Sequence, residues 1–505
     1  MKNMRIAGII AEYNPFHNGH REQIRLLKEE YGFDAVVIVL SGDFLQRGEP
    51  AMTDTYSRTQ MALFGGADLV VKMPVLFSTA SAEYFAFCGV TLLSKLGVDT
   101  LCCGCETPKK EAFLQLADFL LKEPKEYKRL LKTFVKGGDS YPKAREKAVL
   151  ACVENDSKIV EKAGFACKDD CLKIGEEAGF ACKDDCSKIG EEAVRSCEFI
   201  TRGQAFSYCE ILHGANNLLA LEYAKAIQKT KSSLSFLPIQ RVDDGYHSKE
   251  LGTKYASATA IRAALQRLTE QNNSANQQKV QDVLPQETWQ LLQKTEPLKD
   301  IILINREIDE LQKNPTLEST TDTATHAALG DVNLKPLLTL EDFYPLLQYH
   351  LLLQKKEGRP LDYYWDCTKE LSNRIYKYAD KAQNAEELCA CLKTKNYTAT
   401  RITRALCHIL LDIKTPEKEM LTEKALFARV LGFSMAGASI LRNAQKQGQI
   451  PLITKFAHGK KLKNEAAVKL FLQDAFAANL YRQVYFAKTG IFLPREGDFP
   501  VQLRE

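Results

Sequence analysis

The chain has 505 residues, of which 45% are hydrophobic and 26% are charged, and its net charge is only +4. This composition is typical of a water-soluble globular protein with two or three domains, and no apolar run is long enough to span a membrane. The small net charge excludes a global attraction to nucleic acid, so any RNA binding must come from local clusters. Because the first residues lack an export signal, we expect a cytoplasmic protein whose 15 cysteines are reduced.

Residues 5 to about 103 alternate strand-like and helix-like stretches. The apolar runs "RIAGIIAEY", "DAVVIVLSG", "ADLVVKMP" and "VDTLCCG" are separated by the amphipathic "REQIRLLKEEYG", "YSRTQMALFGG" and "AEYFAFCGVTLLSKLG". Continuous apolar strands separated by helices predict a parallel sheet that is covered on both faces. We therefore predict an α/β fold, a doubly wound parallel sheet, for a first domain over residues 1–268.

A tandem repeat interrupts this domain. "AGFACKDDCLKIGEE" (163–177) is followed at once by "AGFACKDDCSKIGEE" (178–192), inside an insertion at about 155–195. Two copies are too few for a solenoid, so we interpret them as a duplicated insertion. The paired cysteines, Cys167 with Cys171 and Cys182 with Cys186, would share a helical face and could bind a soft metal. Their spacing is not that of zinc sites, which favours an exposed helical segment without metal.

The remainder of the chain divides into a polar part and an apolar part. A connecting region and polar linker cover 269–335 and include "NPTLESTTDTATHAALGDVN". From residue 336 to 505 apolar residues recur mostly at helical spacing, which predicts a mostly α-helical C-terminal domain.

"NPFHNGH" (14–20) lies between the first predicted strand and the first predicted helix. Open α/β sheets bind nucleotides at this position, because the helix start presents unpaired N–H groups to phosphate. His17 and His20 can donate hydrogen bonds to phosphate oxygens on either side of Gly19, which would favour attack on an α-phosphate with loss of pyrophosphate. An isolated H-x-x-H would more simply cap a helix or bind a metal, but the strand before it and the helix after it favour the nucleotide.

Seven motifs extend this interpretation: "EYNPFHNGH", "SGDFLQRGEPA", "SAEYFAF", "NNLLALEY", "PIQRVDDGYHS", "ASATAIR" and "TKNYTATRITRAL". The first matches the H-x-G-H motif of the Rossmann-like nucleotidyltransferase superfamily, and together they resemble the family of bacterial tRNA(Met) cytidine acetate ligases. The resemblance covers most of the chain outside the repeat and the linker. It implies that ATP activates acetate as acetyl-adenylate and that the acetyl group passes to N4 of the wobble cytidine of elongator tRNA(Met), forming N4-acetylcytidine.

The resemblance also implies site residues, with His17 and His20 as the catalytic pair. The implied ATP-binding residues are Ile10, Ala11, Glu12, Tyr13, Asn14, Pro15, Phe16, His17, Asn18, Gly19, His20, Arg21, Glu22, Gln23, Gly104, Asn216, Asn217, Arg241, Ser257, Thr259 and Arg262. The predicted RNA-binding residues are Arg47, Lys393, Lys395, Tyr397, Arg401 and Arg404, where cations stand around a ring on which a base could stack. Magnesium is expected with ATP on chemical grounds.

The chain departs from the family pattern at two places. Lys72 in "VVKMP" stands where the family tends to have an acid, and "CCGCE" stands where it has phenylalanine, glycine, serine and glutamate. Two other functions remain open. The chain could be a different H-x-G-H nucleotidyltransferase that adenylylates a small-molecule acid or a mononucleotide, which the large basic helical region disfavours. It could also be a non-catalytic tRNA-binding protein, which the retained histidines and the arginine of "SATAIR" disfavour.

Overall fold

The computed structural model describes residues 4–139, 141–162, 202–241, 254–270, 274–293, 302–304, 334–394 and 397–504. The tandem repeat at 163–192 and most of the predicted linker lie outside the described residues. The chain divides into two compact units, unit 1 with residues 1–104 and 230–505, and unit 2 with residues 105–229. These units do not follow the boundaries predicted at 268 and 335, because the region from 336 onward belongs to the same unit as the first strands.

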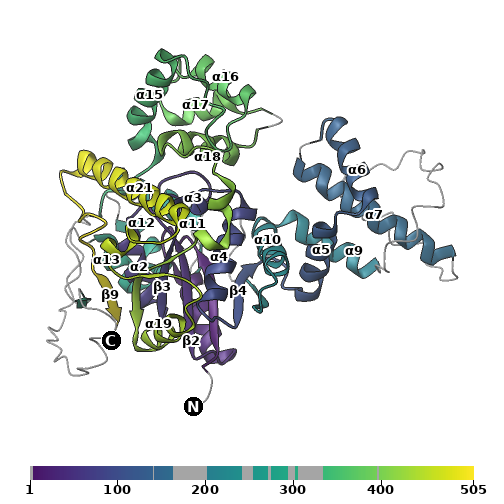
Figure 1. The fold of residues 1–505 in the computed structure, drawn as a ribbon, viewed down its shortest axis with the longest axis horizontal. Helices are drawn as coiled ribbons and strands as arrows, with labels where there is room; N and C mark the ends of the chain where they lie inside the picture. Colours follow the sequence, from purple (N-terminus) through teal and green to yellow (C-terminus); the bar gives the residue numbers. More distant parts are fainter. Residues whose placement is uncertain are drawn as a thin grey trace. The chain divides into compact units, whose positions relative to one another are not determined.

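Within unit 1, nine strands of the described chain form one sheet in the order β5-β4-β1-β2-β3-β7-β9-β6, with β8 paired to β7 (Figure 1). The strands are β1 (Ile6–Ala11), β2 (Ala35–Ser41), β3 (Leu69–Met73), β4 (Thr100–Cys105), β5 (Ser235–Gln240), β6 (Ile302–Ile304), β7 (Ala428–Ser434), β8 (Leu452–Ile453) and β9 (Val501–Arg504). The four strands predicted between residues 5 and 103 are therefore confirmed.

The central strands are parallel. β1 pairs in parallel with β2 and β4, and β2 with β3, with Ile6 opposite Ala35 and Val37 opposite Leu69. Every residue of β2 is buried, which explains why "AVVIVLS" is apolar throughout and not alternating. β7 joins this sheet antiparallel to β3, and β9 then pairs in parallel with β7. The predicted C-terminal domain thus supplies strands to the N-terminal sheet.

The helices of unit 1 alternate with the first strands and then dominate the second half of the chain. They are α1 (Asn18–Arg25), which continues as a π-helix (Leu26–Glu30), α2 (Thr55–Phe64), α3 (Val75–Ser78), α4 (Ala82–Lys95), α11 (Ala258–Glu270), α12 (Ser274–Asp282), α13 (Gln286–Gln293), α15 (Leu340–Lys356), α16 (Lys369–Tyr378), α17 (Ala385–Leu392), α18 (Ala399–Leu410), α19 (Met435–Gln447), α20 (Phe456–Gly459) and α21 (Glu465–Thr489), with 3-10 turns at Lys418–Leu421 and Glu423–Ala425. The hydrophobic core includes Phe16 of the turn after β1, Ile38 of β2, Met61 of α2 and Leu265 of α11. This core therefore joins α2 and α11 to the sheet next to that turn.

Unit 2 is helical. It contains α5 (Lys110–Lys122), α6 (Lys125–Lys136), α7 (Tyr141–Lys162), α9 (Arg202–His213) and α10 (Ala215–Lys229). α10 packs on α5, and α7 packs on both α6 and α9. In neither unit does the described part of the chain include a helix with the length and apolar character needed to cross a membrane.

Candidate active site

The two histidines of the H-x-G-H turn are held by the backbone at the start of α1. His17 is the N-cap residue, and its Nδ1 accepts a hydrogen bond from the backbone N–H of Gly19 at 3.1 Å. The Nδ1 of His20 accepts from the backbone N–H of His17 at 3.2 Å, which completes a reciprocal capping box. The two rings stack with centroids 3.6 Å apart. Because each Nδ1 is an acceptor, the proton of each neutral ring must lie on Nε2.

Both rings are kept neutral by their surroundings. Burial, followed by the nearby charges of Arg241 and Arg262, lowers the pKa of His17 to about 3. Burial, followed by the effects of His17 and Arg241, lowers the pKa of His20 well below its usual value. The Nε2 of His17 is buried and has no hydrogen-bond partner in the described part of the chain. A buried N–H donor without an acceptor is the group that an incoming phosphate oxygen would satisfy.

The two arginines reach the turn from distant segments. Arg262, one turn into α11, donates from Nη1 to the carbonyl oxygen of Asn14 at 3.0 Å and from Nη2 to Thr259 Oγ1 at 3.2 Å. Arg241 follows β5 and lies against the end of β4, where a Cβ added to Gly104 would come within 3.0 Å of its Cγ. Gly104 therefore leaves room for the Arg241 side chain. Arg262 therefore contacts the histidine turn, Arg241 lies close enough for its charge to act on both histidines, and Gly104 lies against Arg241.

The start of α1 is anchored from the far side of the sequence. The amide of Asn18 donates to the carbonyl oxygens of Lys254 at 3.1 Å and Asp282 at 2.8 Å, and its backbone N–H donates to Val283 at 3.1 Å. Ser257 is itself buried, and its hydroxyl caps α11 by accepting the N–H of Ala260. Asn18 and Ser257 therefore fix the positions of the two helix starts.

Several other residues of the predicted segment 10–23 have structural partners. Phe16 is fully buried in the core. Arg21 forms an ion pair with Glu287 at 3.4 Å, and Glu22 pairs with Arg25 at 2.7 Å. These side chains support the turn or lie on the surface of α1, whereas the Nε2 of His17 and the hydroxyl of Tyr13 are buried without a hydrogen-bond partner in the described part of the chain.

Asn216 and Asn217 lie in unit 2, in the first turn of α10. Asn217 Oδ1 accepts the backbone N–H groups of Glu106 at 3.0 Å and Thr107 at 3.1 Å, and Asn216 Nδ2 donates to Glu106 Oε1 at 2.8 Å. The backbone N–H of Asn217 also donates to Glu106 Oε2 at 2.8 Å. Within unit 2 both asparagines thus bind the chain that follows β4, and the carboxylate of Glu106 occupies the start of α10.

Arg58 was missed by the sequence reasoning. It is fully buried in α2, and its guanidinium donates to the carbonyl oxygens of Glu12 at 2.7 Å, Ser41 at 3.0 Å and Thr53 at 3.1 Å, and also to that of Gly42. One side chain therefore ties the carboxyl ends of β1 and β2 together beside the histidine turn. The available signal was that Arg58 is the charged residue of the predicted helical stretch "YSRTQMALF", which has no other.

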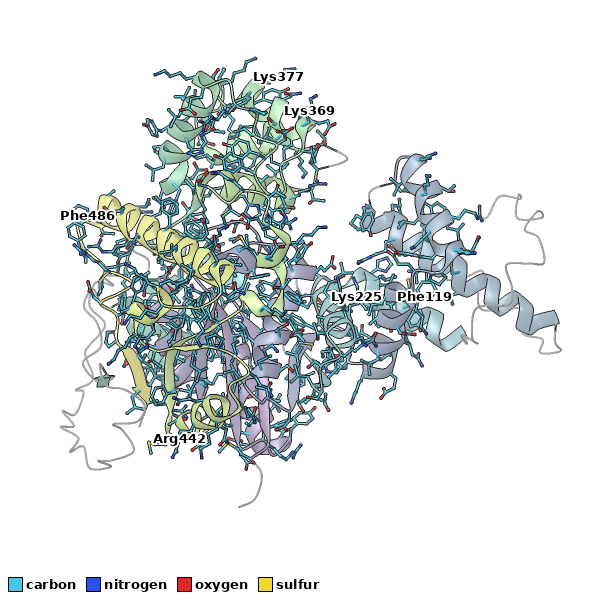
Figure 2. The ribbon with its side chains drawn as sticks, in the orientation of Figure 1. Phe119, Lys225, Lys369, Lys377, Arg442 and Phe486 are labelled. Carbon is cyan, nitrogen blue, oxygen red and sulfur yellow. The ribbon has the colours of Figure 1, made fainter. Side chains whose placement is uncertain are left out.

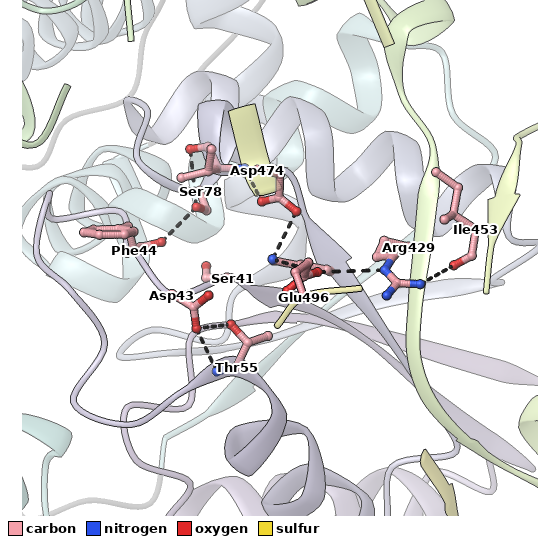
Figure 3. A network of polar contacts seen from close by, with 12 residues as sticks. Ser41, Asp43, Phe44, Thr55, Ser78, Arg429, Ile453, Asp474 and Glu496 are labelled. Atoms are coloured by element: carbon pink, nitrogen blue, oxygen red, sulfur yellow. Dashed lines mark hydrogen bonds and ion pairs between the residues drawn. The ribbon is translucent and has the colours of Figure 1, made fainter. Parts of the chain in front are cut away.

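Lys72, the departure from the family pattern, is neutralised by carboxylates from the C-terminal region (Figure 3). Its Nζ lies 3.1 Å from Asp474 Oδ2 of α21 and 3.4 Å from Glu496 Oε1, and all three side chains are buried. Burial opposes the charge, but the two carboxylates raise the pKa of Lys72, while burial raises the pKa of Asp474 to about 6. Glu496 also lies 3.9 Å from Arg429 Nε of β7. Lys72 therefore ties β3 to α21.

Part of the predicted RNA-binding set lies together near the start of α18. Gly48, at a φ of +76°, packs so closely on α18 that a Cβ there would lie 2.4 Å from the backbone nitrogen of Arg404, and this places Arg47 beside that helix. Arg401 lies over the Tyr397 ring at 5.3 Å. Arg404 is less available, because it pairs with Asp366 at 2.8 Å.

Lys393 is exposed at the end of α17, and Lys395 lies outside the described residues. Two further exposed lysines of this helical group, Lys369 and Lys377, stand on the neighbouring α16 (Figure 2) and were missed by the sequence reasoning. Lys377 stands between Tyr376 and Tyr378 in the sequence, and its Nζ lies over the Tyr378 ring at 5.4 Å, so a cation beside aromatic residues was a signal that could have found it.

The comparison with known families agrees with this geometry. A sequence model of the HIGH Nucleotidyl Transferase family matches residues 4–326 and 303–490. This is the class of protein that the doubly wound sheet and the histidine pair at the end of β1 define.

Curated relatives narrow the class. A protein of Thermoanaerobacter sp. (strain X514) described as tRNA(Met) cytidine acetate ligase is 32% identical over 486 residues, covering 95% of this chain and 96% of the relative. One of Acetivibrio thermocellus with the same description is 30% identical over 495 residues, covering 96% and 98%. The chain therefore belongs to the HIGH nucleotidyl transferase family and, within it, to the tRNA(Met) cytidine acetate ligase family.

A solved structure shares the fold. The crystal structure of Thermotoga maritima TmcAL bound with alpha-thio ATP superposes with a TM-score of 0.69 at 23% identity and covers 99% of both chains. This likeness confirms the predicted fold class, a mostly parallel doubly wound sheet with a mostly helical C-terminal region.

Proposed function

We propose that this chain is an ATP-dependent ligase that activates acetate and acetylates the wobble cytidine of elongator tRNA(Met). In the first step a carboxylate oxygen of acetate attacks the α-phosphorus of ATP, which forms acetyl-adenylate and releases pyrophosphate. In the second step the N4 amine attacks the acyl carbon, AMP leaves, and the amine loses a proton to solvent. The observation that carries the proposal is that His17 and His20 are both fixed as Nε2–H donors, in a member of this ligase family.

The site residues take separate parts in the first step. The two neutral imidazoles would donate to the non-bridging oxygens of the α-phosphate, where charge grows as pyrophosphate leaves. Arg241 and Arg262 place positive charge beside the same rings, and a guanidinium suits the β- and γ-phosphates because it donates in pairs. Gly104 would admit the adenosine next to Arg241. Magnesium would neutralise the triphosphate and be held mainly by phosphate oxygens and water.

One assay separates this function from its alternatives. The full chain is incubated with labelled acetate, ATP and elongator tRNA(Met), and the digested RNA is analysed for N4-acetylcytidine. Acid-stable label in the RNA that requires ATP is the expected result. Label confined to an adenylate would instead support a different nucleotidyl transferase, and tRNA binding without turnover would support a non-catalytic protein.

The histidine pair has its own test within this assay. His20→Ala should slow adenylate formation by about 10²–10³-fold, the usual effect of removing one donor to a developing negative charge. Binding of tRNA should change little. His458→Ala is the matched control, because His458 is an exposed histidine of α20. Equal adenylation by the His20 variant and the wild type would refute the assigned part.

We also propose that the tRNA binds across α16 and the start of α18. Support comes from Arg47, Arg401 and Tyr397 at one helix start, with Lys369 and Lys377 nearby on α16. Arg401→Ala should weaken tRNA binding and reduce its salt dependence, since one phosphate contact is lost. Arg442→Ala on α19 is the control, because the side-chain hydrogen bonds of Arg442 stay within its own helix (Figure 2). Unchanged affinity and salt dependence in the Arg401 variant would place the RNA elsewhere.

A further inference from the structure

Unit 2 contains a cluster of metal-ligand side chains that the proposed ligase reaction does not use. Glu146 lies on α7, and Cys209 and His213 lie four residues apart on one face of α9. One ligand atom from each residue lies within 4.8 Å of the other two. We propose that Glu146, Cys209 and His213 bind a zinc ion.

The hydrogen bonds of His213 point to a cation at this position. Its Nδ1 lies 2.8 Å from the carbonyl oxygen of Cys209, which can only accept, so Nδ1 carries a proton. In the neutral ring Nε2 is then also an acceptor, yet it lies 3.2 Å from Glu146 Oε1. Two acceptors at that distance need a proton or a metal ion between them. A ring whose Nδ1–H donates to a backbone carbonyl, leaving Nε2 free, is the usual arrangement of a metal-binding histidine.

Cys209 adds a soft ligand to the same cluster. Its Sγ lies within 4.8 Å of the ligand atoms of Glu146 and His213, which an ion pair between those two side chains would not require. A thiol must lose its proton to ligate zinc, and this proton would pass to solvent when zinc binds. Because Nδ1 already donates to a carbonyl, it cannot take that proton, which argues against a nucleophilic cysteine here.

The ligand set identifies the metal. Thiolate, imidazole and carboxylate together favour zinc over magnesium or calcium, which prefer oxygen ligands alone. Three protein ligands leave the fourth tetrahedral position for water. The ion would join α7 to α9, the described helices that precede and follow residues 163–201 in the chain. Zinc should therefore stabilise unit 2 by an amount that rises with the logarithm of the free zinc concentration once this exceeds the dissociation constant.

Cobalt binding to the full chain tests the proposal, since Co²⁺ reports tetrahedral coordination and thiolate ligation by its absorption. The cysteines outside the described residues, four in the repeat and one after it, are first removed in a background chain with Cys167→Ser, Cys171→Ser, Cys182→Ser, Cys186→Ser and Cys197→Ser. This background should bind one Co²⁺ per chain, with a thiolate charge-transfer band that zinc abolishes by competition. Cys209→Ser and His213→Ala should each weaken binding by at least about 100-fold, more than the loss of an outer-shell partner costs.

A carboxylate pair supplies the control. Glu146→Gln should weaken cobalt binding, whereas Glu210→Gln should not, because Glu210 pairs with Lys109 at 2.7 Å and is not one of the three ligands. A second measurement needs no variant: zinc should slow the alkylation of Cys209 in the wild-type chain, followed by peptide mass mapping. The proposal is overturned if the background chain binds no cobalt, if the Cys209 variant binds it equally well, or if zinc leaves Cys209 alkylation unchanged.

Discussion

Replacing Arg58 tests whether the carboxyl ends of β1 and β2 depend on one buried side chain. Arg58 is fully buried and donates to the carbonyl oxygens of Glu12, Ser41, Gly42 and Thr53. Arg58→Met keeps an unbranched side chain of similar length but removes every donor. The variant should therefore lose these hydrogen bonds with little change in packing volume.

The magnitude follows from the carbonyls left behind. Three of the four hydrogen bonds, those to Ser41, Gly42 and Thr53, are buried, and at about 1–1.5 kcal/mol for each of these carbonyls deprived of its donor the free energy of unfolding should fall by about 3–5 kcal/mol. At about 1 °C per kcal/mol for a chain of this size, the melting midpoint should fall by about 3–5 °C. Arg58→Lys keeps the charge but offers a single nitrogen, so it should recover only part of the loss.

Thermal melting followed by circular dichroism measures the effect. Arg267→Met is the matched control, because Arg267 is exposed on α11 and its side chain bonds to the carbonyl of Ala263 in its own helix. A further readout separates support of the site from stability alone: below the melting transition, Arg58→Met should also bind ATP more weakly, since Glu12 begins the histidine turn. A melting midpoint within about 1 °C of that of the wild type would be too small a change for the loss of these hydrogen bonds and would refute the reasoning.

Three further predictions concern the same unit. The pKa of His17 is about 3 in the folded chain and has its usual value in the unfolded chain, so protonation favours the unfolded chain. The free energy of unfolding should therefore be highest above pH 6.5 and should fall by about 2 kcal/mol between pH 7.5 and 5. Urea unfolding at both pH values measures this change, which should be smaller in His17→Gln. Lys72→Met should lower the free energy of unfolding by about 3–5 kcal/mol, because Asp474 loses its buried partner, and Asp474→Asn should restore part of it in melting experiments; a Lys72 variant as stable as the wild type would contradict the assigned network. Gly104→Ala places a Cβ 3.0 Å from Arg241 Cγ, so it should weaken ATP binding in calorimetry while leaving the melting midpoint within 1–2 °C, and unchanged affinity would remove Gly104 from the site.

The first half of the sheet could be predicted from sequence because its signals are local. "AVVIVLS" is apolar at every position, as a strand buried on both faces must be, and β2 is buried throughout. The turn after β1 was equally accessible, since a strand, two histidines around a glycine and a helix follow one another within the same short stretch. His17 is the N-cap of α1 in the structure.

The other parts depend on contacts between distant segments. "ARVLGFS" is a short apolar run in a region with helical spacing, and periodicity alone does not tell such a run from a buried helix segment, so β7 and its antiparallel pairing with β3 were missed. The partners of Lys72 lie about 400 residues later in the chain, at Asp474 and Glu496, and no local pattern connects them. Asn217 lies in the first turn of α10, and its amide binds the chain after β4, more than 100 residues earlier in the sequence.

The unpartnered donor of His17 links stability to ligand binding. A buried N–H without an acceptor costs about 1–3 kcal/mol in the folded chain, and the Nε2 of His17 is such a group in the described site. The capping bonds to Gly19 and His20 fix the orientation of this donor before any ligand arrives, so no ring has to turn when a phosphate oxygen enters. The phosphate oxygen would then remove the cost of the unsatisfied donor as well as add a hydrogen bond. Part of the free energy of ATP binding would therefore come from relief of a destabilising feature of the free protein, and a side chain with no buried donor at position 17 would lose that part even if its shape were kept.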